Sequence, residues 1–141
     1  MREVIKWPIR VWLIFIALNF AIIISIGVVL SDTALIIFTA ALSSMTLIFS
    51  ITSRIVLTAS KELLTVGGAN IESRFIKEVV VLDETSMKYE RGVGLNPRAF
   101  LAIRFWVRTG VKIILEDSRD PTPYWLVSSK KGLEIKQALN G

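Results

Sequence analysis

Two long apolar segments that contain no charged residue constrain the fold more than any other feature of the chain. They run from Val11 to Leu30 and from Ala34 to Ile51, and only residues 31–33 separate them. A helix of about 20 apolar residues crosses a hydrocarbon core of roughly 30 Å and satisfies its own backbone there. The pattern predicts that residues 1–53 form an N-terminal segment and a hairpin of two transmembrane helices, followed by a β-rich domain at residues 54–141.

Basic residues flank the two apolar segments. Arg2, Lys6 and Arg10 precede the first segment and Arg54 and Lys61 follow the second, whereas the short connection has no basic residue. Because Lys and Arg are enriched in cytoplasmic flanks, we expect a multi-pass protein of the cell (inner) membrane with both termini cytoplasmic. A signal peptide shares the basic start, but this apolar run is long and a second run follows at once, so we expect the first helix to be retained.

Aromatic and basic side chains at the ends of the segments predict contact with the bilayer surface. Tryptophan is enriched where head groups meet acyl chains, and a basic residue near anionic head groups is stabilised by about 1 kcal/mol. The residues expected to contact the membrane surface are Trp7, Arg10, Trp12, Arg54 and Lys61.

Polar residues within the segments are few. Asn19 has no ionisable partner in either segment, which argues against ion transport or a proton relay. Ala40, Ala41, Ser43 and Ser44 form a small-residue face suited to close packing, either on the first helix or on a second copy of the chain. A homo-oligomer is therefore one open alternative.

The composition excludes several chemistries. The 141 residues include no cysteine and no histidine, which removes disulfides, thiolate nucleophiles, histidine bases and zinc sites built from these residues. The net charge of +5 favours an anionic lipid surface or an acidic protein partner. Acidic and basic residues are interspersed without a basic stripe, so we expect no nucleic-acid binding, and no cofactor is indicated.

Short β-rich segments follow the apolar hairpin. They predict strands at residues 54–59, 62–66, 71–75, 76–82, 87–91, 105–116 and 124–128, with residues 76–82 central in the sheet. Asn96 and Pro97 predict a helical turn over residues 98–102, and Ser129 is expected to cap a closing helix over residues 130–139. The expected α+β fold is a small antiparallel barrel or roll closed by the C-terminal helix, as in pleckstrin-homology-like domains.

Arg104, Trp106 and Arg108 alternate, so in a strand they share one face that could bind a phosphate, a lipid head group or an acidic protein. Alternatively, Trp106 lies in the core and the arginines pair with Asp117 and Asp120. Tyr124 and Trp125 are expected on opposite faces of their strand, one in the core and one exposed. The candidate interaction face comprises Arg98, Arg104, Trp106, Arg108, Asp120, Tyr124 and Trp125.

Glu116, Asp117 and Asp120 form the densest carboxylate cluster. Carboxylates can hold a hard cation, but Asp and Asn also accept local backbone N–H groups in turns, and this use is favoured here. The glycines at residues 67–68 and 92–94 lack the lysine and following helix of a phosphate loop and indicate hairpin turns.

Three runs carry a resemblance to a known family: residues 96–101 (NPRAFL), 104–109 (RFWVRT) and 120–129 (DPTPYWLVSS). With them the chain resembles, over nearly its whole length, an actinobacterial membrane-protein family that contains domain of unknown function 3093. Members of that family often have aspartate in place of Asn96 and proline in place of Phe105. The resemblance implies no activity.

We therefore expect a membrane protein whose cytoplasmic domain binds a protein partner or the anionic lipid surface and is not an enzyme. Two alternatives stay open. One is a structural subunit of a larger membrane complex, and the other is an enzyme of lipid or envelope chemistry that uses the carboxylates Asp117 and Asp120.

Overall fold

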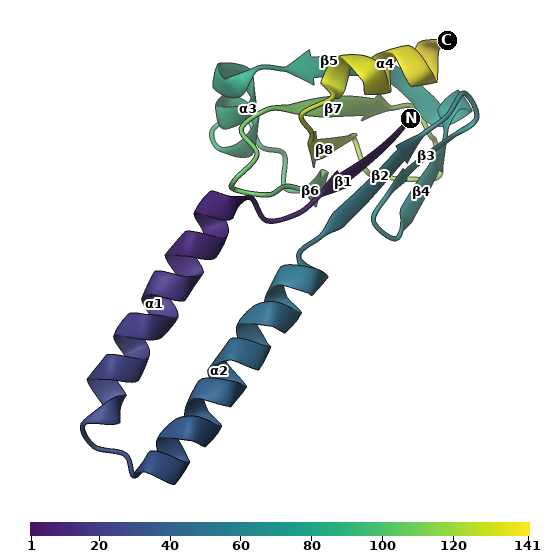
Figure 1. Ribbon diagram of the computed structural model, residues 1–141. Coiled ribbons are helices and arrows are strands. Elements are labelled where there is room, and N and C mark those ends of the chain that lie inside the picture. The colour runs from purple at the N-terminus through teal and green to yellow at the C-terminus, as the bar shows by residue number, and fades with distance from the viewer. The chain divides into compact units, whose positions relative to one another are not determined.

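The computed structural model describes all 141 residues, which form two compact units (Figure 1). The helical unit comprises Lys6–Arg54. The β unit comprises Ile55–Gly141 together with Met1–Ile5, although the whole helical unit separates these two segments along the chain. The sequence analysis predicts no strand in the first five residues, so their place in the β unit is a finding of the structure.

The helical unit consists of α1 (Ile9–Gly27) and α2 (Asp32–Thr52), which confirms both predicted helices. Each is long and apolar enough to cross a membrane. Ser31, in the connection between the helices, caps the N-terminus of α2, because its side chain accepts a hydrogen bond from the backbone N–H of Ala34 at 3.4 Å. This is the geometry of an N-cap, which satisfies a backbone donor that has no partner within the helix.

Polar and aromatic contacts join α1 and α2. Asn19 Nδ2 donates a hydrogen bond to Thr46 Oγ1 at 2.9 Å, so the one amide of the first helix is satisfied by a hydroxyl of the second. The Trp7 ring stacks on Phe15 with centroids 4.5 Å apart and lies edge-on to Phe49 at 5.6 Å. Inside a bilayer such contacts, rather than hydrophobic burial, hold helices together.

The small-residue face of α2 does not provide these contacts. Ala40, Ala41, Ser43 and Ser44 are all exposed on the helical unit. The buried residues of α2 are Thr46 and Ser50, which do not belong to this face. Packing of the small-residue face on a second copy stays a prediction.

The first sheet of the β unit is antiparallel throughout and has the order β1-β2-β3-β4. Its strands are β1 (Arg2–Ile5), β2 (Ile55–Ala59), β3 (Leu63–Val66) and β4 (Ala69–Glu72). Ile5 lies opposite Ile55, so the residues just before and just after the helical unit are cross-strand neighbours. Gly67 has φ +60° in the turn between β3 and β4, a conformation that favours glycine.

The second sheet has the order β5-β7-β8-β6. Its strands are β5 (Ile76–Leu82), β6 (Phe100–Ala102), β7 (Gly110–Leu115) and β8 (Tyr124–Ser128). Neither sheet closes into a barrel, and β6 pairs with β8 in parallel, so the predicted antiparallel barrel is wrong. β5 has the predicted bounds but is an edge strand, and its apolar character reflects its contacts with two helices.

Those helices are α3 (Glu84–Arg91) and α4 (Gly132–Asn140), and a short 3-10 helix, Ser73–Phe75, precedes β5. The strand predicted at residues 87–91 is therefore wrong. The reason is a cap upstream of it: Asp83 Oδ1 accepts a hydrogen bond from the Ser86 N–H at 2.7 Å and starts a helix.

Three local predictions around the second sheet also need correction. The predicted helical turn at residues 98–102 is a short turn followed by strand β6 from Phe100, because Asn96 accepts the Arg98 N–H with its Oδ1 and the Ala99 N–H with its carbonyl, both at 3.0 Å, and no helix follows. The predicted strand 105–116 exists only from Gly110, because a turn closes where the Val107 N–H donates to the Arg104 carbonyl at 3.0 Å. α4 begins after Lys131, and no side chain caps it.

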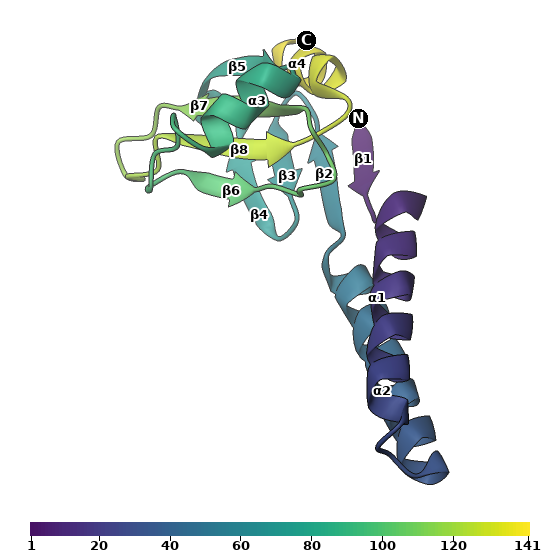
Figure 2. The same ribbon diagram turned by 90° about the vertical axis from the view of Figure 1, so that its left-hand side faces the viewer.

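Two apolar layers hold the β unit together. One lies between the two sheets, which face each other in Figure 2, and includes Leu57, Leu64, Ile113, Trp125 and Val127. The other lies on the far face of the second sheet under α3 and consists of Leu82, Met87, Tyr124 and Leu126. β8 is therefore buried on both faces, and the prediction that either Tyr124 or Trp125 is exposed is wrong.

We predict that Gly110→Ala destabilises the β unit by about 1–3 kcal/mol, the usual cost of overpacking a core. An added Cβ would meet the Val127 carbonyl oxygen and would lie 2.9 Å from Met87 Cε. Gly68→Ala is the matched control, because no atom lies within 4 Å of its added Cβ. Urea unfolding in detergent measures both variants, and equal midpoints would contradict the close packing at Gly110.

Candidate functional site

Asp117 and Asp120, in the loop between β7 and β8, accept hydrogen bonds from backbone N–H groups of the same loop. Asp117 Oδ1 accepts the Arg119 N–H and Asp120 Oδ1 accepts the Thr122 N–H, both at 2.9 Å. These bonds confirm the predicted use of both aspartates in turns. The hydrogen bonds from the side chain and backbone of Thr122 lower the pKa of Asp120, since they favour its ionised form.

The loop between β6 and β7, residues 103–109, carries three of the predicted site residues, and we call it the aromatic loop. It is fixed to the end of β8: the Arg104 N–H donates to Ser128 Oγ at 2.9 Å, and Thr109 Oγ1 donates to the Ser129 carbonyl at 2.7 Å. Val107 is buried in the core between the sheets. Phe105 points outward, with 66% of its surface exposed.

The other side chains of the aromatic loop have defined contacts. Trp106 is partly buried against the core between the sheets and meets Phe105 edge-on, with centroids 4.9 Å apart. The Arg104 guanidinium donates to the carbonyl of Ile103 at 2.9 Å. Arg108 pairs with Glu84 at 3.0 Å on the surface, where both side chains are mostly exposed. Such an exposed pair contributes little and leaves Arg108 able to exchange partners.

The seven residues of the candidate interaction face do not lie together. The aromatic loop places Arg104, Trp106 and Arg108 near the Ser128 end of β8. Arg98 and Asp120 belong to the Tyr124 end, because β6 runs parallel to β8 with Phe100 opposite Trp125. Tyr124 and Trp125 are themselves buried. The exposed part of the face that the structure keeps together is thus the aromatic loop.

The residues predicted at the membrane surface are spread over both units. Arg10 and Arg54 are exposed in the helical unit, and Trp12 lies edge-on to Trp7 at 5.2 Å. Lys61 is exposed in the turn between β2 and β3. It comes after the last residue of β2, whereas Ile55 is the first residue of that strand. Trp7 is only 5% exposed, so its predicted contact with the membrane surface is wrong, whereas contact of the other four residues with lipid stays a prediction.

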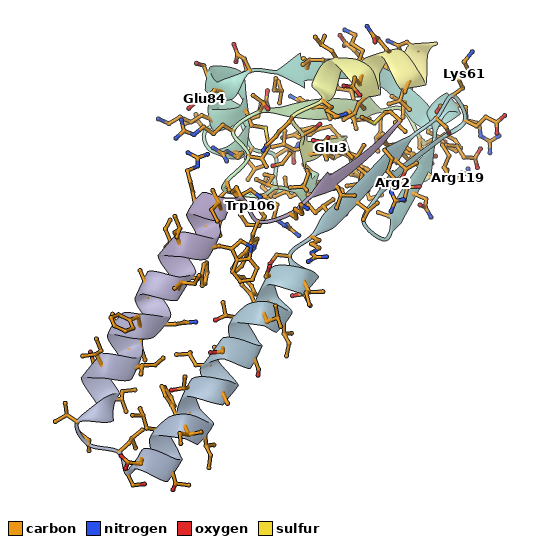
Figure 3. The ribbon with its side chains drawn as sticks, viewed as in Figure 1. Arg2, Glu3, Lys61, Glu84, Trp106 and Arg119 are labelled. Atoms are coloured by element: carbon orange, nitrogen blue, oxygen red, sulfur yellow. The ribbon has the colours of Figure 1, made fainter.

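Sequence reasoning missed a buried carboxylate, Glu3, which is 8% exposed in β1 (Figure 3). It accepts a hydrogen bond from Ser129 Oγ and one from the Lys130 N–H, the latter at 3.0 Å. Ser129 Oγ in turn accepts the Lys131 N–H at 2.9 Å. The first strand thus supplies the polar partner for the segment that leads into the last helix. Exposed and buried residues alternate along Arg2–Ile5 in the structure, but the sequence has two charged residues followed by two apolar ones, so no local pattern indicates β1.

A second polar network lies on the far face of the second sheet. Lys112 Nζ is 3.1 Å from both carboxylate oxygens of Glu90 and 4.5 Å from the centre of the Tyr124 ring. The Tyr124 hydroxyl accepts the Asn96 N–H at 2.9 Å and donates to the Gly94 carbonyl at 3.5 Å. These bonds hold the loop after α3 against the sheet.

A cleft of about 590 Å³ in the β unit is open to solvent. It lies where α3, β7 and α4 begin, and its lining includes Thr109 and Ser129. Its lining includes charged residues of both signs, Lys130, Lys131, Asp83 and Glu134, and Lys131 pairs with Glu134 at 3.3 Å. This mixture does not select for a ligand of one charge.

We predict that Glu3→Ala destabilises the β unit by about 1–3 kcal/mol, because it leaves the Ser129 hydroxyl and the Lys130 N–H without their acceptor. Arg2→Ala, at the exposed neighbouring position, is the control and should change stability by less than about 0.5 kcal/mol. Thermal unfolding in detergent compares the two, and an Arg2→Ala effect as large as that of Glu3→Ala would contradict the proposed contact.

We predict that Asp120 makes stability pH-dependent in acid. Its pKa is lowered in the folded chain, so its contribution is present above the ordinary value of 3.8 and is lost as the pH falls through the folded pKa. Thr122→Val removes the hydroxyl and should raise the pKa of Asp120 toward 3.8. An NMR titration of the carboxyl carbon measures this shift, and an unchanged pKa would show that the threonine side chain does not stabilise the carboxylate.

Comparison with known proteins gives a family without an assigned activity. The family model described as protein of unknown function (DUF3093) matches residues 1–139. Neither the curated proteins nor the solved structures provide a match. The matched range includes β1, both apolar helices and all of α4 except its last residue, so it covers the helical unit and the β unit alike. The chain belongs to the DUF3093 family of proteins of unknown function.

Proposed function

We propose that the protein is anchored in the cell membrane by α1 and α2, with both termini in the cytoplasm, and that its β unit is a non-catalytic docking module. The observation that carries this proposal is the pairing of β1 with β2. These strands flank the hairpin and lie side by side in one sheet, with Val4 opposite Val56 and Ile5 opposite Ile55. Two membrane crossings return the chain to the side from which it started, as this pairing requires.

The charges favour the cytoplasm for that side. Lys6, Arg10 and Arg54 lie at the ends of the helices that adjoin the β unit along the chain, and Asp32 is the only charged residue at the other ends. Basic residues close to a membrane segment are retained on the cytoplasmic side. The same charges are attracted to anionic lipids of that leaflet.

The structural contacts made by the carboxylates of the β unit support a docking role rather than a catalytic one. Asp117 and Asp120 close turns, Glu3 holds the segment before α4, and Glu90 pairs with Lys112. Each of these carboxylates has a structural use.

Single cysteines test the topology directly, because the chain contains none of its own. We predict that Asp32→Cys, at the tip of the hairpin, reacts with a membrane-impermeant maleimide in intact cells. Ser118→Cys, exposed in the β7–β8 loop, should react only after permeabilisation. Labelling of Ser118→Cys in intact cells, or of neither variant before permeabilisation and both after it, would overturn the proposed arrangement.

A further inference from the structure

We infer that the aromatic loop docks on the anionic surface of the bilayer, with Phe105 entering the boundary between head groups and acyl chains. This inference rests on the proposed function, because it requires that α1 and α2 span the membrane. Three observations carry it: the exposure of Phe105, the basic side chains beside it, and the position of the loop in the β unit.

Phe105 is an exposed aromatic residue in a loop that is hydrogen-bonded at both ends. It is 66% exposed although its neighbour Val107 is only 1% exposed, and its ring contacts Trp106 edge-on. The hydrogen bonds from the Arg104 N–H and the Thr109 hydroxyl fix both ends of the loop. A phenyl ring held outward on a fixed loop beside an indole has the character of the aromatic belts at membrane interfaces.

The charges on the loop fit an anionic surface. Arg104 and Arg108 flank Phe105 and Trp106, and residues 103–109 contain no acidic residue. The Arg108 pair with Glu84 is exposed and therefore weak, so a lipid phosphate can replace the carboxylate. An arginine beside anionic head groups favours binding, and a phenyl ring adds the burial of apolar surface.

Within the β unit, the loop lies at the end of β1 from which the chain continues into α1. Trp106 packs against the core cluster that includes Ile5, the last residue of β1, and the chain between β6 and β7 passes that end of β1 in Figures 1 and 2. Only residues 6–8 separate β1 from α1, and four residue steps span at most about 14 Å. The chain thus tethers this end of the β unit close to the bilayer, whatever the angle between the units.

The docking surface lies at the end of the β unit that the chain itself tethers to α1, and its occupant is the anionic leaflet rather than a separate protein. Lys6 and Arg54, which border the β unit on either side of the hairpin, extend the same basic character. The loop would hold the β unit in one orientation on the surface.

Depth-dependent fluorescence tests this on the full-length chain. Phe105→Cys is labelled with the apolar, environment-sensitive dye NBD and placed in nanodiscs of phosphatidylcholine, alone or mixed with phosphatidylglycerol. We expect a blue-shifted emission and quenching by nitroxide lipids, both stronger in the anionic nanodiscs. Ser118→Cys, exposed in the β7–β8 loop, is the matched control and should show neither. Adding Arg108→Gln should weaken the anionic component by about fivefold.

A third labelled site separates failure of this inference from failure of the proposed function. Leu18→Cys lies in α1 with 52% of Leu18 exposed. If the dye at residue 18 is quenched and the dye at residue 105 is not, the membrane anchor stands and the docking of the loop is overturned. If neither is quenched, the proposed function fails with it. Protection of residue 105 in native membranes but not in lipid nanodiscs would overturn lipid docking in favour of a protein partner.

Discussion

The rest of the structure depends on the pairing of β1 with β2. Two short strands on either side of the apolar hairpin occupy neighbouring positions in one sheet, with Ile5 opposite Ile55. Backbone pairing at this point fixes where both helices leave the β unit, since only residues 6–8 and 53–54 link the strands to the helices. An isolated hairpin of strands is marginal in water, but here β3 and β4 extend the sheet and the second sheet covers its apolar face. The helical unit is therefore joined to the β unit at one pair of neighbouring strands.

Glu3 extends this dependence to the end of the chain. Its buried carboxylate binds the Ser129 hydroxyl and the Lys130 N–H, and α4 begins two residues later. Ile135 of α4 then packs in the core between the sheets. Removing the first five residues would take away a strand, a core side chain at Ile5 and the acceptor for the segment before α4. A fragment that starts after the second helix should for this reason not be treated as an independent domain.

The sequence was informative where one local pattern decides the structure. The lengths of the apolar runs predict α1 and α2, and β-branched residues between turn signals predict β5 and β8 with their observed bounds.

Sequence reasoning failed where a contact with a distant residue, or a helix cap nearby, determines the local structure. Asp83 converts residues 87–91 into a helix, and β1 forms only because β2 returns beside it after the two helices. Arg104, Trp106 and Arg108 do not alternate on a strand, because the chain turns between Arg104 and Val107. Burial of Tyr124 and Trp125 on opposite faces follows from a second apolar layer under α3, which periodicity within a single strand does not reveal. The exposure of Phe105 likewise depends on hydrogen bonds to Ser128 and Ser129, far along the chain.

Disulfide crosslinking between β1 and β2 tests the central claim most directly. Val4 and Val56 lie opposite each other, and neither side chain is in the core. In a chain without cysteine, Val4→Cys combined with Val56→Cys should form an intramolecular disulfide on mild oxidation of the protein in native membranes. Thr58→Cys with Thr65→Cys, opposite each other on β2 and β3, is the positive control, and Val4→Cys with Asn70→Cys is the mismatched pair. The account predicts crosslinking of the first two pairs and not of the third. Failure of the Val4–Val56 pair while the Thr58–Thr65 pair crosslinks would contradict it, because the hairpin ends would then not be joined in one sheet.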